Sequence, residues 1–492
     1  MSNAWNALQG RVDELKTIEG LMALAEWDQQ VMMPAGGAAA RGGQLAFLSG
    51  LYHDKLAAAD VGRWLAQTEP EDPVQSAAIR NMDRAYQRAI RIPTALVTEQ
   101  ARARSDAFGA WVKAKEANDF ASFAPHLEKV FELTRTTIGH LKQPHHATDY
   151  DVLLEQFDPG STVAQLDPMF DRLAAGTAEL LAAIDACDPP EGLSGEHDVN
   201  RQEGLNQAVA AALGFDMEAG RLDASEHPFT IGMVPGDVRI TTHIYPDRVV
   251  QGLTGTIHET GHGLYEQGLK LAPKPVAEPA GFGLHESQSR FWENFIGRSL
   301  PFSRWLEKLS GEHLAQPLSA GQFYAQSNKV ERSLVRIFAD EVTYNLHIIV
   351  RYRLERQVLA GTLAVADLPE AWNAEMESVV GISPATDAEG VLQDVHWASG
   401  AVAYFPSYTL GNLYAASLGA VIEEDIPDIW AQVERGEFAP TLTWLRDKIH
   451  RHGHQYDAPE LMRLAVGERD HVKDLLDYLW GRHGALYGAK RG

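Results

Sequence analysis

The sequence predicts a mainly α fold: a large helical protein with one small antiparallel β-sheet. Two patterns support this prediction. Apolar residues recur three and four positions apart along most of the chain, which is the spacing of one helix face. By contrast, the stretch 227–250 alternates β-branched and polar residues around a Pro-Gly pair that is typical of a tight turn. We therefore expect helices over about two-thirds of the residues, well above the average for globular proteins.

The N-terminal part of the chain is predicted to be helical throughout. One helix ends at the proline and glycines of WDQQVMMPAGG, and a later one has Pro125 in its first turn. Because no linker divides the chain, we expect a single domain, 1–492, with a helical N-terminal lobe of about 1–200 and a second lobe of about 201–492. The apolar faces are formed by Leu8, Val12, Leu15, Leu21 and Leu24 in the first helix, and by Leu127, Val130, Phe131, Ile138 and Leu141 in the later one.

The strand-rich stretch 227–250 leads directly into the next predicted helix. A sheet edge there can pair with an extended peptide, and a purely structural hairpin is an equally good interpretation. Downstream, residues 323–361 are predicted to form one long helix. Gly381 and Gly390 interrupt the chain after it. Two terminal helices are predicted from Leu461, Leu464, Val472, Leu475, Leu476 and Leu479.

The composition argues against some classes of partner. The chain carries 43 basic and 67 acidic residues, a formal charge of −24, which argues against nucleic acid or an anionic membrane as a partner. The sequence has no uninterrupted apolar run long enough to span a bilayer, and its first residues lack the basic start and apolar core of a signal peptide. The single cysteine, Cys187, excludes an intramolecular disulfide and fits a reducing compartment, so we expect a cytoplasmic protein.

The stretch TGTIHETGHGLYEQG contains the pattern His-Glu-x-x-His. At 3.6 residues per helical turn, His258 and His262 project from one face and can share one ion, forming half of a tetrahedral zinc site. Glu259 lies about 100° further around the helix, which suits a general base for a metal-activated water. A chance match is the alternative, since 19 histidines in a chain of this length spell the pattern in roughly one such chain in twenty.

A catalytic zinc of this kind needs a third protein ligand and one open position. The segment GFGLHESQSRFWEN follows the motif with a helical pattern, and we predict Glu286 as the third ligand. A solvated helix carboxylate is the alternative interpretation of Glu286. His285 and Glu293 are the nearest competitors for the third position.

These residues are part of a wider pattern that resembles the carboxypeptidase Taq family of metallocarboxypeptidases. WDQQVMMPAGG, FPSYTLGNLY and IHRHG also look like family segments. Two departures are visible. Val335 stands where the family usually has Ile, and His243 follows DVRITT where we expect Arg, so that a neutral imidazole replaces a permanent cation. The resemblance is carried by five motifs: DVRIT at 237–241, HETGH at 258–262, HESQ at 285–288, VRIFAD at 335–340 and GVLQDVHW at 390–397.

The resemblance implies a zincin-type peptidase with a deep active-site groove, in which the second lobe is the catalytic one. It further implies zinc-dependent release of single amino acids from peptide C-termini, with broad side-chain preference and poor action next to proline. Zinc is the expected ion and cobalt the alternative. The expected partners are a peptide substrate and a second copy of the chain in a homodimer.

The tetrahedral intermediate of peptide hydrolysis needs a donor for its oxyanion. The resemblance to the family and to related helical zinc peptidases favours His396 and Tyr408 for this role, with Tyr404 as a weaker candidate. A buried tyrosine that satisfies a backbone carbonyl is the alternative interpretation.

A carboxypeptidase also has to bind a terminal carboxylate, which a guanidinium holds through two hydrogen bonds. Arg239 and Arg336 lie inside family motifs and are the substrate-binding candidates. Each is equally well interpreted as part of a structural ion pair, for example with Asp237 or Asp340. Asp340 and Asp394 are interpreted either as carboxylates that orient a zinc-bound histidine or as helix caps and salt bridges.

Two rival functions stay open at this point. A zinc endopeptidase or dipeptidase would use the same metal site, and a non-catalytic helical binding protein would carry HETGH by accident. The other histidine groups, His145 with His146 and the tract His450, His452 and His454, are interpreted as structural or solvent-facing, although short histidine tracts can bind metal.

Overall fold

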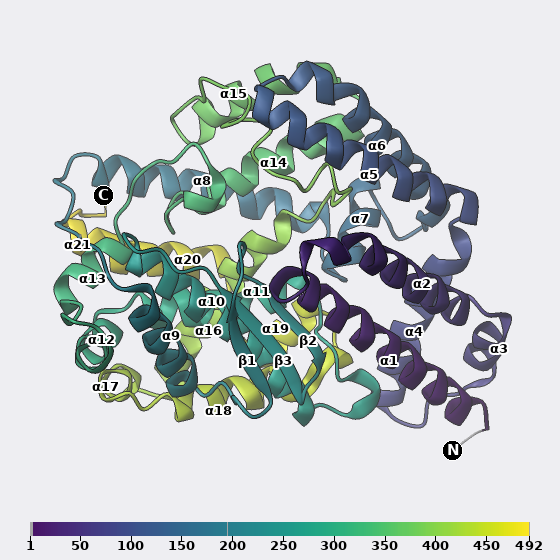
Figure 1. Cartoon of the computed structure of the whole chain (residues 1–492), viewed down its shortest axis with the longest axis horizontal. Coiled ribbons are helices and arrows are strands. Elements are labelled where there is room, and N and C mark those ends of the chain that lie inside the picture. Colours follow the sequence, from purple (N-terminus) through teal and green to yellow (C-terminus); the bar gives the residue numbers. More distant parts are fainter. Residues whose placement is uncertain (1–2, 194, 492) are drawn as a thin grey trace. The chain divides into compact units, whose positions relative to one another are not determined.

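The computed structural model describes residues 3–193 and 195–491. Helices account for 69% of the structure, and the described ranges contain one sheet of three strands (Figure 1). The predicted fold class, mainly α with a small sheet, is confirmed. None of the described helices combines the length and the apolar character needed to cross a membrane.

Two compact units are formed, each from three segments of the chain. The first unit consists of the residues up to Ile90, Glu191–Ser327 and Tyr414–Arg469. The second consists of Arg91–Pro190, Asn328–Leu413 and the residues from Asp470 onward. The single domain with lobes that divide near residue 200 stays a prediction.

The first unit contains the sheet and the helix of the HETGH motif, α10 (Val249–Gly268). Its strands are β1 (Gly220–Ala224), β2 (Thr230–Val234) and β3 (Asp237–Thr242). Its other helices are α1 (Asn3–Val31), α2 (Ala38–Leu56), α3 (Ala59–Gln67), α4 (Pro73–Arg91), α9 (Val199–Leu213), α11 (Phe282–Arg290), α12 (Leu300–His313), α13 (Ala320–Ser327), α17 (Ile429–Arg435), α18 (Ala439–Lys448) and α19 (Ala458–Val466).

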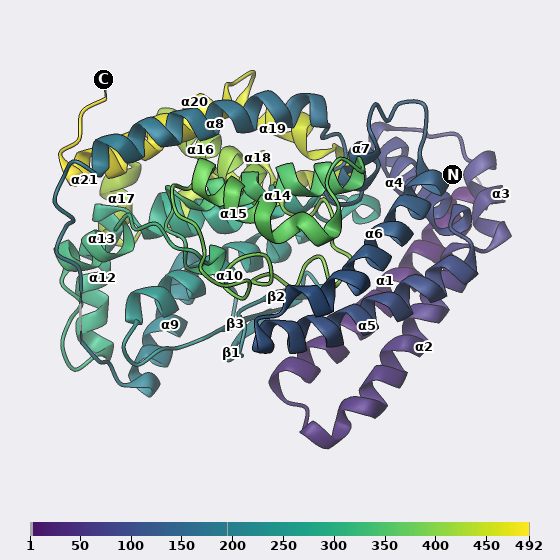
Figure 2. The same cartoon turned by 90° about the horizontal axis from the view of Figure 1, so that it is seen from above.

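The second unit is helical. Figures 1 and 2 both show α8 alongside α20, where Gly176 of α8 leaves room for the side chain of Leu476. Helix α16 (Pro406–Asp425) contributes residues to both units. The other helices of the second unit are α5 (Thr94–Ala117), α6 (Phe120–Leu141), α7 (Asp149–Phe157), α8 (Val163–Ile184), α14 (Tyr344–Leu359), α15 (Leu368–Val379), α20 (His471–Leu479) and α21 (Ala485–Tyr487).

The sheet is mixed, which corrects the expectation of an antiparallel one. β2 and β3 form the predicted antiparallel hairpin around Pro235 and Gly236, but β1 pairs with the other edge of β3 in parallel, giving the order β1-β3-β2. The sequence of β1, GRLDA, does not predict a strand, because it has no β-branched residue and no regular alternation.

The sheet packs directly on α10. Val238 and Ile240 of the central strand β3 are fully buried, and Gly263 of α10 lies against Ile240. A Cβ added at Gly263 would lie 3.0 Å from the Ile240 side chain, so the glycine allows the helix to approach the strand closely. The predicted placement of strands immediately before the HETGH helix is therefore confirmed.

The single helix predicted over 323–361 is wrong. α13 ends at Ser327, α14 begins at Tyr344, and the chain between them is irregular apart from a 3-10 turn at Arg336–Phe338. The side chain of Arg336 is buried in this segment and bonds to the Asp394 carboxylate. Tertiary hydrogen bonds thus override a sequence pattern with helical spacing.

Two smaller predictions also differ in detail. α6 begins at Phe120, where the Asp119 side chain accepts a hydrogen bond from the Ser122 amide, so Pro125 lies inside the helix rather than in its first turn. α1 ends at Val31, shortly before the proline and glycines that were predicted to end it. Its residues Leu21 and Leu24, predicted on the apolar face, are 49% and 39% exposed.

Candidate metal centre

The two histidines of the HETGH motif lie one turn apart on α10, in the first unit. His258, His262 and Glu286 each offer one atom to a group whose atoms all lie within 4.8 Å of one another. Glu286 comes from the neighbouring helix α11 and is buried, whereas both histidines are partly exposed. The structure therefore places the three predicted ligands together.

The spacing of these atoms fits a divalent ion. Glu286 Oε2 lies 3.6 Å from His258 Nε2 and 3.3 Å from His262 Nε2. Ligands bound tetrahedrally at zinc distances of about 2.0–2.1 Å lie about 3.3–3.4 Å apart. Two imidazole nitrogens and one carboxylate oxygen are also a donor set that zinc accepts in catalytic sites, with one position left open. The residues present therefore fit the predicted ion.

Glu286 is fixed through its second oxygen. Arg290, one turn further along the chain, donates from Nε to Glu286 Oε1 at 2.7 Å. This bond directs Oε2 toward the two histidines. The carboxylate can therefore bind an ion through one oxygen while its orientation is maintained by the guanidinium.

The competitors for the third position, His285 and Glu293, contact the outer nitrogens of the two histidines instead. His258 Nδ1 donates to Glu293 Oε2 at 2.9 Å, and His262 Nδ1 lies 2.6 Å from His285 Nδ1. Each contact holds a proton on Nδ1 and so presents the lone pair of Nε2. His285 and Glu293 thus occupy places suited to orienting the ligands rather than to binding the ion.

Each of these two orienting residues is itself anchored. Glu293 accepts hydrogen bonds from Arg298 at 2.6 Å and from Arg290 at 3.2 Å. His285 Nε2 lies 2.9 Å from Glu266 Oε1, which extends the contact with His262 to a carboxylate on α10. Each predicted ligand histidine is therefore connected to a carboxylate. His258 bonds to Glu293 directly, and His262 is connected to Glu266 through the imidazole of His285.

The electrostatics favour the protonation states that a metal needs. Burial, with repulsion from His285, lowers the pKa of His262 to about 3. Burial raises the pKa of Glu286, but Arg290 and His258 outweigh it and hold that pKa well below its usual range. Burial also lowers the pKa of His258, although attraction by Glu286 and Glu293 outweighs it and the net pKa is raised. A neutral His262 and an ionised Glu286 are the metal-binding forms.

Glu259 lies beside this group and is held by the sheet. Thr230 of β2 donates its hydroxyl to Glu259 Oε2 at 2.7 Å. Burial raises the pKa of Glu259, with the Thr230 hydrogen bond acting in the opposite direction. A buried carboxylate with a raised pKa is a better proton acceptor than a solvated one, as a general base requires.

The glycine of the HETGH motif, Gly261, explains how α11 comes close enough to contribute Glu286. A Cβ added at Gly261 would lie 2.6 Å from the carbonyl oxygen of Gln288 and 2.7 Å from Cα of Ser289. Both are backbone atoms, which cannot turn aside as a side chain can. Gly261 is therefore required for the close contact between the two helices that carry the ligands.

His396 and Tyr408 lie in the second unit and contact one another. His396 Nε2 is 3.2 Å from the Tyr408 hydroxyl, and the His396 ring packs on Phe405 with centroids 4.5 Å apart. Burial lowers the pKa of His396 to about 4, so its imidazole is neutral near pH 7. Tyr404 packs edge-on against Tyr408 at 5.3 Å between centroids.

Arg336 is buried in the second unit and bonded to Asp394, not to Asp340. Its guanidinium donates to Asp394 Oδ1 at 2.8 and 3.0 Å and to the Tyr344 hydroxyl at 3.0 Å. Arg351 bonds to the other oxygen of Asp394 at 2.6 Å. Asp340 instead accepts hydrogen bonds from the Val342 and Thr343 amides, in the turn just before α14.

Arg239, in the first unit, forms an ion pair with Asp237, which agrees with the structural interpretation of this arginine. Its guanidinium donates two hydrogen bonds of 2.9 Å to Asp237. It also lies over the indole of Trp27, 4.2 Å from the ring centroid. Trp27 begins the segment WDQQVMMPAGG, so this family segment and the DVRIT motif meet at one place.

A second histidine cluster, His145, His146 and Glu155, has ligand-like spacing but an unsuitable tautomer. The Gln143 amide donates to His146 Nδ1 at 2.9 Å, which puts the proton on Nε2, where it is donated to Glu155 at 2.8 Å. A nitrogen that carries a proton has no lone pair for a metal. The geometry thus favours the structural interpretation of these histidines.

Several residues that support the site could not be predicted from the sequence. Thr230, Glu266, Arg290 and Arg298 all contact ligands or their partners, but single polar residues outside a motif carry no sequence signal. His450 could have been found, because it belongs to the segment IHRHG. It is fully buried, and its Nε2 lies 3.0 Å from Oε1 of Gln288, the last residue of the HESQ motif.

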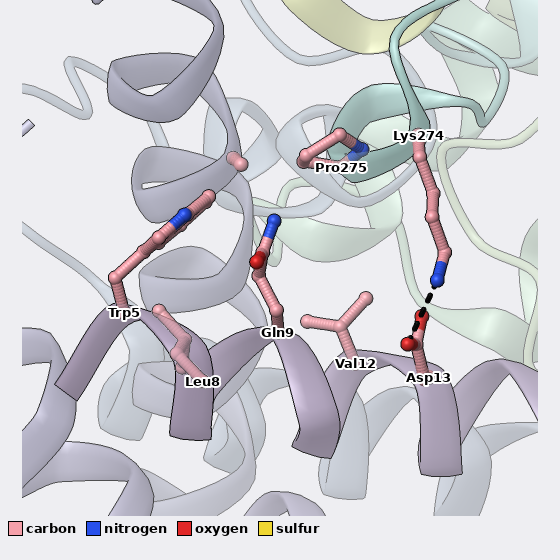
Figure 3. Close-up of a pocket in the computed structure, with 8 residues that line it drawn as sticks. Trp5, Leu8, Gln9, Val12, Asp13, Lys274 and Pro275 are labelled. Atoms are coloured by element: carbon pink, nitrogen blue, oxygen red, sulfur yellow. Dashed lines mark hydrogen bonds and ion pairs between the residues drawn. The ribbon is translucent and has the colours of Figure 1, made fainter. Parts of the chain in front are cut away.

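A small pocket elsewhere in the first unit holds no catalytic group (Figure 3). It has a volume of about 120 Å³, and Trp5, Leu8 and Val12 of α1 line one side. Its two charged lining residues, Asp13 and Lys274, form an ion pair of 2.8 Å and neutralise one another.

Comparison with known proteins agrees with this geometry. The chain matches the family model of carboxypeptidase Taq (M32) metallopeptidase over residues 7–483. It is 40% identical to thermostable carboxypeptidase 1 of Thermus thermophilus, over 96% of this chain and 97% of that protein. It is 38% identical to carboxypeptidase 1 of Bacillus subtilis, over 83% of each chain. A crystal structure of M32 carboxypeptidase from Deinococcus radiodurans R1 is similar with a TM-score of 0.94 and 35% identity, over 99% of this chain and 100% of that one. The chain, an enzyme that hydrolyses peptide bonds, therefore belongs to the carboxypeptidase Taq (M32) family of metallopeptidases.

Proposed function

We propose that this protein is a zinc-dependent carboxypeptidase that releases single amino acids from peptide C-termini. The observation that carries the proposal is the group of His258, His262 and Glu286 atoms, all within 4.8 Å of one another, with Glu259 beside it. Membership of a metallocarboxypeptidase family supports the same activity. The alternatives are an endopeptidase or a dipeptidase with the same site, while family membership excludes the non-catalytic binding protein.

A divalent ion held by these three residues would polarise the scissile carbonyl and acidify a water molecule. Glu259 would take the proton from the attacking water and pass it to the leaving amine. The Thr230 hydroxyl occupies Glu259 Oε2, which leaves Oε1 as the oxygen that exchanges the proton.

His396 and Tyr408 are proposed as oxyanion donors. Their mutual hydrogen bond fixes the orientation of both groups, and the lowered pKa of His396 keeps a neutral imidazole that donates from only one nitrogen. Tyr404 remains the weaker candidate.

Of the two proposed substrate-binding arginines, Arg336 is the stronger candidate for the terminal carboxylate. Arg336 and Arg351 share the single carboxylate of Asp394, so this buried group keeps one positive charge. Arg239 is neutralised by its own carboxylate, Asp237. A net positive charge with hydrogen-bonding capacity is what an anionic peptide end requires.

Further properties are proposed from the resemblance to the family. Cobalt is an alternative ion, side-chain preference is broad, and cleavage next to proline is poor. A homodimer and a cytoplasmic location also remain proposals, the latter from the single cysteine in the chain.

The experiment that tests the proposed function compares a peptide with a free C-terminus and the same peptide with an amidated one, with mass spectrometry of the products. We expect sequential loss of single C-terminal residues from the first peptide and little cleavage of the second. Equal internal cleavage of both would support the endopeptidase, and release of residue pairs the dipeptidase. Purified protein without a bound ion and without chelator-sensitive activity would contradict the proposed zinc dependence.

A further inference from the structure

We infer that Glu355 of α14 is a positioning residue that fixes the irregular segment 393–405, and with it the side chain of His396. The inference concerns the conformation of this segment. It rests on the proposed function only where it predicts an effect on turnover.

The segment needs fixed points because it has no secondary structure of its own. Within the described chain, residues 380–405, between α15 and α16, form neither helix nor strand. Its own backbone hydrogen bonds only close turns, such as those from Ser399 N to Val395 O at 3.0 Å and from Ala401 N to His396 O at 2.9 Å. Its conformation therefore also depends on contacts with the elements around it. The segment is nevertheless largely buried, including Trp397, Val402 and Ala403.

Glu355 supplies two of these fixed points. Its side chain is fully buried, and Oε1 accepts a hydrogen bond from Trp397 Nε1 at 2.8 Å. Oε2 accepts one from the Ala403 amide at 3.1 Å and one from the Tyr150 hydroxyl at 2.6 Å. A carboxylate can accept all three bonds at once, whereas an amide of the same shape would place a donor against one of them. The three contacts therefore require two acceptor oxygens, which a carboxylate has, whereas the side-chain amide of glutamine has only one.

The backbone at Ala403 shows that the segment is held against its own preference. Ala403 has φ of 68°, in the left-handed region, and it is one of two non-glycine residues with positive φ in the described chain. A residue with a Cβ is strained in this region and stays there only when its surroundings fix it. The hydrogen bond from the Ala403 amide to Glu355 is such a constraint.

The other end of the segment is held by the same face of α14. Arg351, one turn before Glu355, bonds to Asp394 Oδ2 at 2.6 Å and to Gln393 Oε1 at 2.7 Å. His396 lies between the residues held by Arg351 and those held by Glu355. Two buried charged residues four positions apart therefore fix the chain on both sides of His396.

Glu355 is fully buried and cannot itself touch substrate, so it acts through the segment. The test uses Glu355→Gln in the full-length, metal-loaded enzyme, with Tyr352→Phe as the matched control. Tyr352 is a buried residue of the same helix, and its hydroxyl bonds to Asp167 at 2.7 Å. The control thus removes two hydrogen bonds of α14, the one to Asp167 and one of 3.3 Å from Arg356, without removing a bond to the segment.

Hydrogen exchange read by mass spectrometry reports the conformation directly. We expect Glu355→Gln to raise exchange in peptides that cover 393–405 while leaving peptides of α10 unchanged, and Tyr352→Phe to leave 393–405 protected. If the proposed function holds, kcat falls about ten- to hundredfold with KM and metal content unchanged, as misplacement of a catalytic group predicts.

A second variant tests the strain. Glycine adopts positive φ without a Cβ penalty, so adding Ala403→Gly to Glu355→Gln should restore part of the protection and of kcat. Should the Gln variant fail to fold, Trp397→Phe takes its place as the test. It removes the donor to Glu355 Oε1 and should raise exchange in the same segment. Unchanged exchange at 393–405, or an increase spread over the whole chain, would overturn the inference. Absence of carboxypeptidase activity in the unmodified protein would instead count against the proposed function and leave the exchange result valid.

Discussion

His262 and His285 face one another through their Nδ1 atoms, which lie 2.6 Å apart. Glu266 accepts the hydrogen bond of His285 Nε2 at 2.9 Å. The carboxylate therefore determines which nitrogen carries the proton in His285 and then in His262. His285 then accepts at Nδ1, and His262 donates from Nδ1 and presents Nε2 with its lone pair. The opposite order at His146 is the reason that the second histidine cluster does not suit a metal.

Replacing Glu266 with Leu should therefore weaken metal binding without removing a ligand. Losing the carboxylate leaves the tautomer of His285 undetermined, and changes of this kind typically lower metal affinity about 10–100-fold. Competition with a chromogenic chelator measures the affinity. Gln251→Leu, on the same helix, is the control and should bind the ion as the unmodified chain does. Equal affinities for the two variants would contradict the role of the chain of hydrogen bonds.

Glu259→Gln should abolish most turnover and keep the metal. Loss of a general base typically lowers the rate about 10²–10⁴-fold, and the amide cannot accept the proton of the attacking water. Steady-state kinetics together with metal analysis separate the two effects. Thr230→Val, which removes only the hydrogen bond to Glu259 Oε2, should cause a smaller loss of kcat. A Gln variant with turnover within a few-fold of normal would exclude Glu259 as the base.

Gly261→Ala should damage both the fold and the metal centre. The new Cβ would lie 2.6 Å from the backbone of α11, and relief requires the helix with Glu286 to move away. Overpacking of this kind costs about 1–3 kcal/mol, and the displaced carboxylate should also lower metal affinity. Denaturant unfolding and chelator competition measure the two effects.

Gly255→Ala on the same helix is the matched control. Nothing lies within 4 Å of a Cβ at Gly255, so this change should stabilise the protein, by up to about 1 kcal/mol from helix propensity. Equal unfolding free energies and metal affinities for the two variants would mean that the close contact at Gly261 is not required for the fold or the metal centre.

Burial raises the pKa of Glu355 to about 7 from a usual value of 4.5, which makes stability depend on pH. The folded protein holds this proton more tightly than the unfolded chain does. Its contribution is therefore fully present below about pH 4.5 and is lost as the pH rises through about 7. The difference in unfolding free energy between the unmodified protein and Glu355→Gln should change by on the order of 3 kcal/mol between pH 5 and pH 8. Parallel stability curves for the two proteins would contradict the raised pKa.

Chelation should inactivate the enzyme and lower its melting temperature. An ion that binds the folded state alone adds stability that grows with its concentration over Kd, about 2.7 kcal/mol at a hundredfold excess over Kd. Zinc or cobalt should restore both activity and melting temperature. Restoration of activity alone, with no thermal shift, would show that the ion contributes little to folding.

The fold class and the centre of the candidate site were predictable because both depend on local periodicity. The spacing of His258 and His262 needs only the pitch of a helix, and the contrast between helical and alternating patterns located the hairpin. Glu286 could be selected because HESQ follows HETGH closely. The pairing of β1 could not be predicted, since a parallel partner on the far edge of a strand leaves no turn signal in the sequence.

The surroundings of the site depend on long-range contacts that no periodicity encodes. The helix predicted over 323–361 failed because Arg336 and Asp340 use their side chains to order an irregular segment. His285 and Glu293 had the right chemistry to be ligands, and only the direction of their contacts, toward Nδ1 rather than Nε2, distinguishes an orienting role from a binding one.

The metal centre is built from a short stretch of the first unit. The three predicted ligands, the proposed base Glu259 and the supporting residues Glu266, His285 and Arg298 all fall within 258–298 of the chain. A nascent polypeptide thus displays every one of these groups once Arg298 has left the ribosome, while much of the chain after Arg298 remains to be translated. Capture of the cation during synthesis would then require closure of only a small loop, with a correspondingly small entropic penalty.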